Sequence, residues 1–271
     1  AWYTAAMPRP LRLLAAALAC AAALAAAACG GDSGGGDLTE GLTPAEVLER
    51  SAEEAAALES FRIALDAEGS VEFPPGSEAV GGLLRGPLEL SGEGPVAPPD
   101  RASIDVRVSF SGLPLQVNVT RVGDAVYLGA LGQDFQLTVS PEQVALLDLG
   151  ALYPSLVNWV AEPEQAGEEE VGGAPTVRIR GAIDPGRAEA ELAPFLGEGL
   201  RPTGSVEAWV GTEDLVPRRV RLEARGEGRG VREADIGLTA TLSDFGADVS
   251  IEAPAGARRL DPEQLGALIG G

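Results

Sequence analysis

The sequence predicts an α+β fold built on one large, curved antiparallel β-sheet of about ten strands. Many segments alternate apolar and polar residues with a period of two, which is typical of strands with one buried face. These segments follow one another in groups instead of alternating singly with helices, and few segments carry helix-start signals. A sheet of this size usually curls or closes. Its apolar face must therefore be covered by a few short helices.

The expected helices are recognised by their first residues. A capping side chain followed by proline occurs at Thr43, Ser140, Asp184 and Asp261, and all but Asp184 also have Glu or Gln in the first turn. The cap accepts a hydrogen bond from a free N–H group, and proline tolerates the first helical position because it has no N–H to leave unpaired. The predicted helices cover residues 44–59, 141–149, 185–197 and 262–269, with a fifth short helix over 151–160.

The expected strands show one apolar and one polar face. Around residues 61–68, the apolar Ile63 and Leu65 alternate with Arg62 and Asp66. Antiparallel sheets often face water on one side, so this alternation favours antiparallel pairing. The same pattern is found at residues 103–110, 115–120, 177–180, 219–223 and 235–242. The acidic tract Glu162–Gly173 is expected to form a hairpin or loop with a solvated face.

The beginning of the chain resembles a bacterial export signal. Arg9 and Arg12 precede an uncharged, alanine-rich run over residues 13–28. This layout is typical of a secretory signal peptide, and the run is shorter than the ~20 residues of a membrane-spanning helix. Cys29 follows small residues, as in a lipobox, although Ala26 stands where a lipobox prefers leucine.

Three regions are expected from this pattern. Residues 1–28 form the signal peptide, residues 29–41 a flexible glycine-rich tether, and residues 42–271 a single domain. We predict that Cys29 carries a lipid, because a lone cysteine in an exported chain otherwise lacks a partner. The alternative is an ordinary signal peptide cut within the alanines, which leaves Cys29 as a free thiol.

The composition excludes several kinds of chemistry. The chain contains neither histidine nor lysine, and its net charge is −21. Nucleophilic triads, Schiff bases and zinc or copper sites depend on histidine, lysine or cysteine. A strongly acidic chain is also a poor partner for nucleic acid. We therefore predict no catalytic residues, no metal and no cofactor. A hydrolase that uses two carboxylates stays open, although no spacing indicates such a pair.

Four segments resemble the LppX/LprG-type lipoproteins of actinobacteria, which are related to the LolA/LolB-like lipoprotein carriers. Ser60–Gly69 is similar to the first strand of that family, and Val122–Leu128 resembles its central hairpin. Gly211–Glu223 resembles its paired late strands, and Leu238–Ala257 is similar to its closing strands. The resemblance implies a half-barrel sheet whose concave face is covered by helices.

The resemblance also implies a function. The expected protein is a membrane-anchored, non-enzymatic lipoprotein of the cell envelope. It would sit on the extracytoplasmic face of the cell membrane and bind or transport a lipid or lipoglycan by its acyl chains. A membrane transporter is an expected partner. The candidate cavity residues are Ile63, Leu65, Val106, Val108, Leu115, Val117, Val126, Leu128, Leu147 and Leu156.

A second interpretation stays open beside the lipid carrier. The same apolar faces would form a filled core in a cell-surface interaction or assembly module without a ligand. Burying one CH₂ group is worth roughly 0.8 kcal/mol. Filling the space is therefore favourable both for a bound acyl chain and for the protein's own side chains. Aromatic residues make up only 4% of the chain, which favours unfilled space in a wide sheet. For Trp159 and Trp209, packing roles are expected.

Overall fold

The computed structural model describes most of the chain from residue 36 onward. The described residues are 36–72, 87–110, 113–130, 132–139, 144, 147–196, 199, 201–227 and 232–260. Cys29, the predicted signal peptide, most of the predicted helix over 141–149 and the predicted helix over 262–269 lie outside them. The fold outlined below belongs to the compact unit that begins at Asp37.

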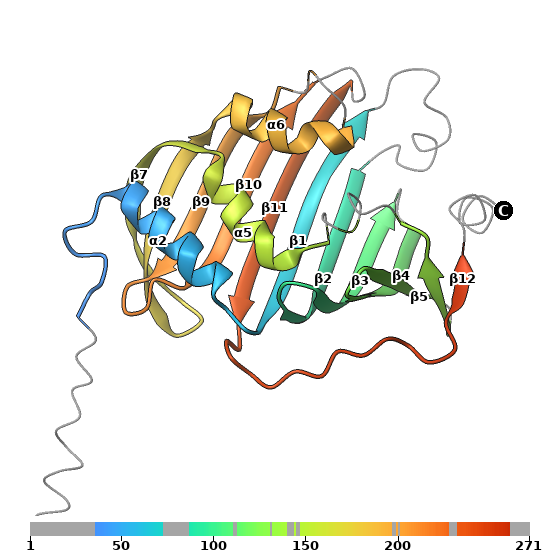
Figure 1. Cartoon of the computed structure of the whole chain (residues 1–271). Helices are drawn as coiled ribbons and strands as arrows, with labels where there is room; N and C mark the ends of the chain where they lie inside the picture. The colour runs from blue at the N-terminus through green and yellow to red at the C-terminus, as the bar shows by residue number, and fades with distance from the viewer. Residues whose placement is uncertain are drawn as a thin grey trace, which may run out of the picture. The chain divides into compact units, whose positions relative to one another are not determined.

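The described strands form one sheet of twelve strands, more than the ten or so that the sequence predicts. Its spatial order is β12-β6-β5-β4-β3-β2-β1-β11-β10-β9-β8-β7 (Figure 1). The strands are β1 (Phe61–Glu72), β2 (Pro87–Ala97), β3 (Arg101–Phe110), β4 (Leu113–Val122), β5 (Ala125–Ala130), β6 (Gln133–Leu137), β7 (Val160–Val171), β8 (Ala174–Ile183), β9 (Thr203–Gly211), β10 (Pro217–Gly226), β11 (Glu233–Ser243) and β12 (Arg258–Leu260).

Neighbouring strands pair antiparallel, with one exception among the described residues. The last strand, β12, runs parallel to β6. The exception follows from the path of the chain, because a long segment after β11 passes along one end of the sheet before β12 reaches β6 (Figure 1). This segment is held by a hydrogen bond from the Ser60 hydroxyl to the Ala247 carbonyl at 2.6 Å, and Arg101 donates to the Ile251 carbonyl at 3.2 Å.

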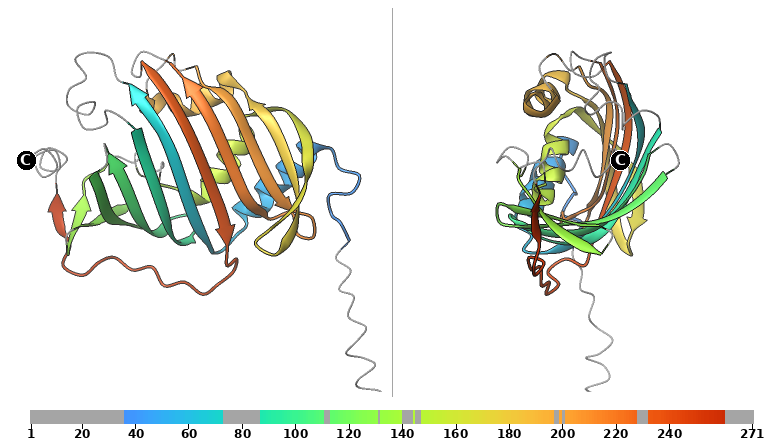
Figure 2. Two further views of the ribbon diagram at one scale, coloured as in Figure 1. Left: turned by 180° about the vertical axis from the view of Figure 1, so that it is seen from behind. Right: turned by 90° about the vertical axis from the view of Figure 1, so that its right-hand side faces the viewer.

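Three described helices lie on the same face of the sheet. They are α2 (Pro44–Ala56), α5 (Leu149–Asn158) and α6 (Pro185–Leu196). The end-on view in Figure 2 shows the sheet curving around them, so they occupy its concave side. The expected α+β fold, with a large curved sheet and a few helices on its concave face, is confirmed. No described helix has the length and hydropathy of a membrane span.

Two described helices, α2 and α6, begin at predicted capping residues, and α5 begins at a cap that was not predicted. Thr43 and Glu46 form a reciprocal capping box at the start of α2, with Pro44 at the first helical position. Asp148 caps α5 by accepting hydrogen bonds from Gly150 and Ala151. Asp184 accepts from Gly186 and Arg187 at the start of α6. Each cap satisfies N–H groups that a helix cannot pair internally.

The acidic tract Glu162–Gly173 belongs to a hairpin. It forms most of β7 and reaches the turn at Gly172 and Gly173, from which β8 returns. The register of β7 against β8 is interrupted twice. Since β7 is an edge strand, its exposed glutamates and irregular register hinder pairing with another chain.

Candidate functional site

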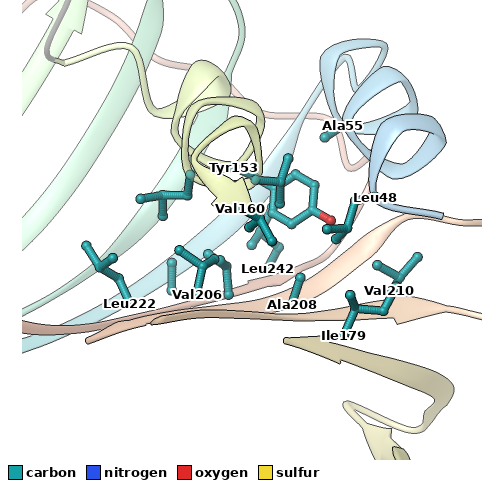
Figure 3. Packing of buried hydrophobic residues seen from close by; sticks show 14 of the residues in the cluster. Leu48, Ala55, Tyr153, Val160, Ile179, Val206, Ala208, Val210, Leu222 and Leu242 are labelled. Carbon is teal, nitrogen blue, oxygen red and sulfur yellow. The ribbon is translucent and has the colours of Figure 1, made fainter. Parts of the chain in front are cut away.

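The inner face of the sheet is the side toward the helices, and it divides into a packed part and an open part. In the packed part, side chains of α2 and α5 meet those of β1 and β7–β11. Figure 3 shows Leu48 of α2 and Tyr153 of α5 above Val206 and Ala208 of β9. These four residues are almost completely buried. This part of the inner face forms the hydrophobic core.

The helices α2 and α5 are joined in the core by a polar contact between two side chains. The Tyr153 hydroxyl donates to the Ser51 Oγ at 2.8 Å, and both residues are buried. Burial raises the pKa of Tyr153 above its usual range, and the Ser51 hydrogen bond offsets part of that effect. Among the described residues, no buried side-chain polar atom lacks a hydrogen-bond partner.

The open part of the inner face lies mainly on β2–β5, beyond α2 and α5. Its side chains are half-buried or exposed, although they are apolar and stand on the same face as the core. Leu115 is 38% exposed, and Ile236 of β11 is 37% exposed. We call this surface the open apolar face. It consists of Leu88, Leu90, Val106, Val108, Leu115, Val117, Val119, Leu128, Ile236 and Leu238. Val106 and Leu238 lie at its border, where they also pack against the core.

Two glycines of β2 leave the inner face without side chains between the packed and the open parts. Gly92 of β2 lies between Leu65 of β1 and Val106 of β3, with which it is directly paired. The position has no side chain, and an added Cβ would come within 3.1 Å of Ile104 Cγ2. Gly94, the next inner-face residue of β2, would place a Cβ against the Ser103 carbonyl. The strand can therefore pass close to β3 only with glycine here.

The ten candidate cavity residues fall into three groups. Ile63, Val126 and Leu156 are almost fully buried, at 1%, 1% and 2% exposure, and pack as core. Leu65 and Val106 are half-buried against that core. The remaining five are Val108, Val117, Leu128 and Leu147, which are half-buried, and Leu115, which is exposed.

Strand register brings several of these residues together. Val106 is paired with Val117, and Val108 with Leu115, across β3 and β4. Directly opposed side chains on one face lie about 5 Å apart at Cβ, so they form one continuous surface. Leu128 of β5 continues that surface beyond Val119. Leu147 lies before α5, outside the sheet.

Both tryptophans are anchored by polar contacts that no local sequence signal indicates. The Trp159 indole donates to Glu191 of α6 at 2.6 Å, and the Trp209 indole donates to Glu169 of β7. Both rings are buried, at 7% and 4% exposure. Arg219 lies over the Trp209 ring, 5.4 Å from its centroid. These contacts fit the packing roles expected for both tryptophans, because a buried indole N–H needs a partner.

The described residues offer little for catalysis by a metal ion. They contain no group of three or more acidic or cysteine side chains placed to hold one. The open apolar face consists of hydrocarbon side chains, which can bind hydrocarbon by excluding water. Its chemistry is therefore that of a binding surface for apolar molecules.

The described fold defines a class of protein with a single curved sheet whose helices cover part of its apolar face. Among solved structures, the chain is similar to the lipoprotein LppX of Mycobacterium tuberculosis, with a TM-score of 0.50 and 15% identity over 77% of this chain and 98% of that chain. It is also similar to LprF of Mycobacterium bovis, with a TM-score of 0.49 and 18% identity over 79% and 97%.

The likeness to LppX shows that this chain has an LppX-type fold, as the resemblance of its sequence segments predicted. A LolA superfamily protein of Nitrosomonas europaea matches with a TM-score of 0.30 and 9% identity over 77% of this chain and 96% of that chain. No family model and no curated protein matches the sequence.

Proposed function

We propose that this chain is a lipid-anchored, non-enzymatic protein of the cell envelope that binds the acyl chains of a lipid or lipoglycan and transports it. The open apolar face carries this proposal. A soluble domain normally buries apolar side chains, and contiguous exposed apolar surface marks a binding site. The LppX-type fold supports the same conclusion, because LppX is itself a lipoprotein.

The energetics of such binding need no polar anchor. Each buried CH₂ group contributes roughly 0.8 kcal/mol, so a dozen methylenes would give about 10 kcal/mol before the cost of association. The paired side chains of Val106, Val108, Leu115 and Val117 provide a hydrocarbon surface across β3 and β4. A hydrocarbon tail lying on it would remove apolar area from water on both sides.

Lipid binding is tested with chain purified from its own host and with a fluorescent fatty acid. We expect native mass spectrometry to detect a bound lipid that solvent extraction removes, and we expect the delipidated chain to take up the fatty acid. Leu115→Asp on the open apolar face should weaken uptake. Leu38→Asp is the matched control, because Leu38 is a 49% exposed leucine outside that face. A chain that holds no lipid and takes up no fatty acid would refute the proposal.

The anchor is a separate part of the proposal. We infer that the residues before Cys29 are removed and that a lipid on Cys29 tethers the domain to the outer side of the cell membrane. The apolar run and the glycine-rich segment after Cys29 support this. Metabolic labelling with a palmitate analogue tests it. Wild-type chain should be labelled and partition into detergent, and Cys29→Ser chain should do neither.

A second candidate is an interaction module with a filled core. The complete burial of Ile63, Val126 and Leu156 favours it, because three of the ten candidate cavity residues pack against the protein's own atoms. The two candidates differ in the uptake experiment. A filled core predicts that Leu115→Asp and Leu38→Asp have the same small effect and that no lipid copurifies.

A further inference from the structure

The outer face of the sheet, opposite the helices, carries a hollow of about 1210 Å³ that is lined by polar and apolar residues. Its lining includes runs such as Arg107–Ser109 and Glu223–Arg225, which begin and end with polar residues. Side chains alternate across a strand, so the polar ones point into the hollow. The apolar residues between them, such as Val108, contribute backbone. Figure 2, viewed from behind, shows these strands without a helix over them. We call this feature the outer hollow.

The charges that line the outer hollow nearly cancel. Four arginines face five carboxylates in the lining, whereas the whole chain carries a net charge of −21. A site for a polyanion needs an excess of cations, and a site for a polycation needs an excess of carboxylates. A nearly balanced lining favours a ligand that is uncharged and polar.

The charged groups keep unused hydrogen-bonding capacity. Arg221 Nη2 lies 2.7 Å from Glu223 Oε1, and Arg225 Nε lies 2.9 Å from Asp235 Oδ2. A guanidinium has five N–H donors and a carboxylate about four acceptor sites, so each pair leaves several of both. Arg107 makes no ion pair with any described residue. Donors and acceptors therefore stand side by side.

The bottom of the outer hollow is formed in part by short residues, some of which carry hydroxyl groups. Ser91 and Thr239 lie in the register row that also holds Arg221 and Arg107, and Gly237 has no side chain. No aromatic side chain occurs among the described residues of the lining. Acyl chains need apolar walls, and the centre of a protein–protein interface is usually aromatic or apolar. The lining fits neither of these partners.

We propose that the outer hollow binds an uncharged oligosaccharide, either free or as the sugar head of a glycolipid. Each sugar hydroxyl both donates and accepts a hydrogen bond, so neighbouring hydroxyls match neighbouring guanidinium and carboxylate groups. This second site lies on the opposite face from the open apolar face. It does not depend on acyl-chain binding, and each site can be present without the other.

The test is a titration of the full chain, labelled with ¹⁵N, with maltohexaose, mannohexaose and dodecyl maltoside. We expect at least one free oligosaccharide to shift the signals of Arg107 and Arg221. Dodecyl maltoside distinguishes the two sources of sugar, because its tail should also shift Leu115 and Leu128, which belong to the open apolar face and do not line the outer hollow, if the ligand is a glycolipid. Arg107→Ala should weaken sugar binding about tenfold, the loss expected for one hydrogen bond to a charged group.

Arg259→Ala is the matched control, because Arg259 is an exposed arginine outside the outer hollow, and it should bind the sugar like wild type. Fatty-acid uptake by Arg107→Ala should be unchanged, which separates this test from that of the proposed function. The proposal is overturned if no sugar shifts outer-hollow signals, if Arg107→Ala and Arg259→Ala bind alike, or if the only residues that respond are those of the open apolar face that do not line the outer hollow.

Discussion

The Tyr153 hydroxyl of α5 donates a hydrogen bond to the Ser51 Oγ of α2 at 2.8 Å, inside the core. Ser51 is 0% exposed and Tyr153 is 3% exposed, so water cannot replace either partner. The bond fixes the two helices relative to each other where they cover β9 and β10. This hydrogen bond therefore adds a directional contact to the apolar packing between the two helices.

Removing one hydroxyl should destabilise the fold. We expect Tyr153→Phe to lower the free energy of unfolding by about 1–3 kcal/mol, because it leaves the Ser51 hydroxyl buried without its partner. Urea denaturation followed by circular dichroism measures this. In the control, the double variant Ser51→Ala/Tyr153→Phe should lose clearly less than the sum of the two single variants. Strict additivity would show that the two groups do not interact.

The same tyrosine should make the fold sensitive to alkaline pH. Burial raises the folded-state pKa of Tyr153 above the usual value of 10.0. The unfolded chain therefore releases this proton first, and the contribution to stability, complete below pH 10, is lost as the pH rises. Unfolding free energies at pH 8, 10 and 11 should fall more steeply for wild type than for Tyr153→Phe. Equal slopes would contradict the raised pKa.

The division of the inner face predicts that truncating a packed side chain lowers the stability of the fold much more than truncating an open one. Ile63→Ala should cost about 2–5 kcal/mol, because Ile63 is 1% exposed and its removal leaves a cavity. Leu115→Ala should change stability by about 0.5 kcal/mol or less, since Leu115 is 38% exposed. Thermal unfolding of both variants measures the contrast. Similar losses at the two positions would mean that Leu115 also belongs to a closed core.

The helices and strands that the sequence predicted are those with strong local signals. The capping residues Thr43 and Asp184 mark the starts of α2 and α6, and the alternation around Ile63 marks β1. The fifth predicted helix, over 151–160, corresponds to α5, which starts two residues earlier because Asp148 provides the cap. Local hydrogen bonds and periodicity decide these features, so a single sequence contains them.

Features that depend on distant residues were not predictable in the same way. Alternation identifies the inner face of β3 and β5, but it cannot separate Val126, which is 1% exposed, from the half-buried Val108. That difference depends on packing between residues that are distant in the sequence. The parallel pairing of β12 with β6 likewise depends on the path of the preceding segment. In addition, β12 has only three residues, which is too short for an alternating pattern to be recognised.

The capping box of α2 should make the fold sensitive to acid. The Thr43 backbone N–H donates to the Glu46 carboxylate at 2.8 Å, and this bond, with the Thr43 hydroxyl as second cause, lowers the pKa of Glu46 below 4.5. The stabilising effect is therefore present above pH 4.5 and is lost as the pH falls through the lowered folded-state pKa.

We expect the urea midpoint to fall more between pH 7 and pH 3 for wild type than for Glu46→Gln. Glutamine can accept the same hydrogen bond without titrating, and Glu46→Ala should begin from a lower midpoint at pH 7. If all three proteins lose the same stability on acidification, the Glu46 carboxylate does not contribute to the acid sensitivity of the fold.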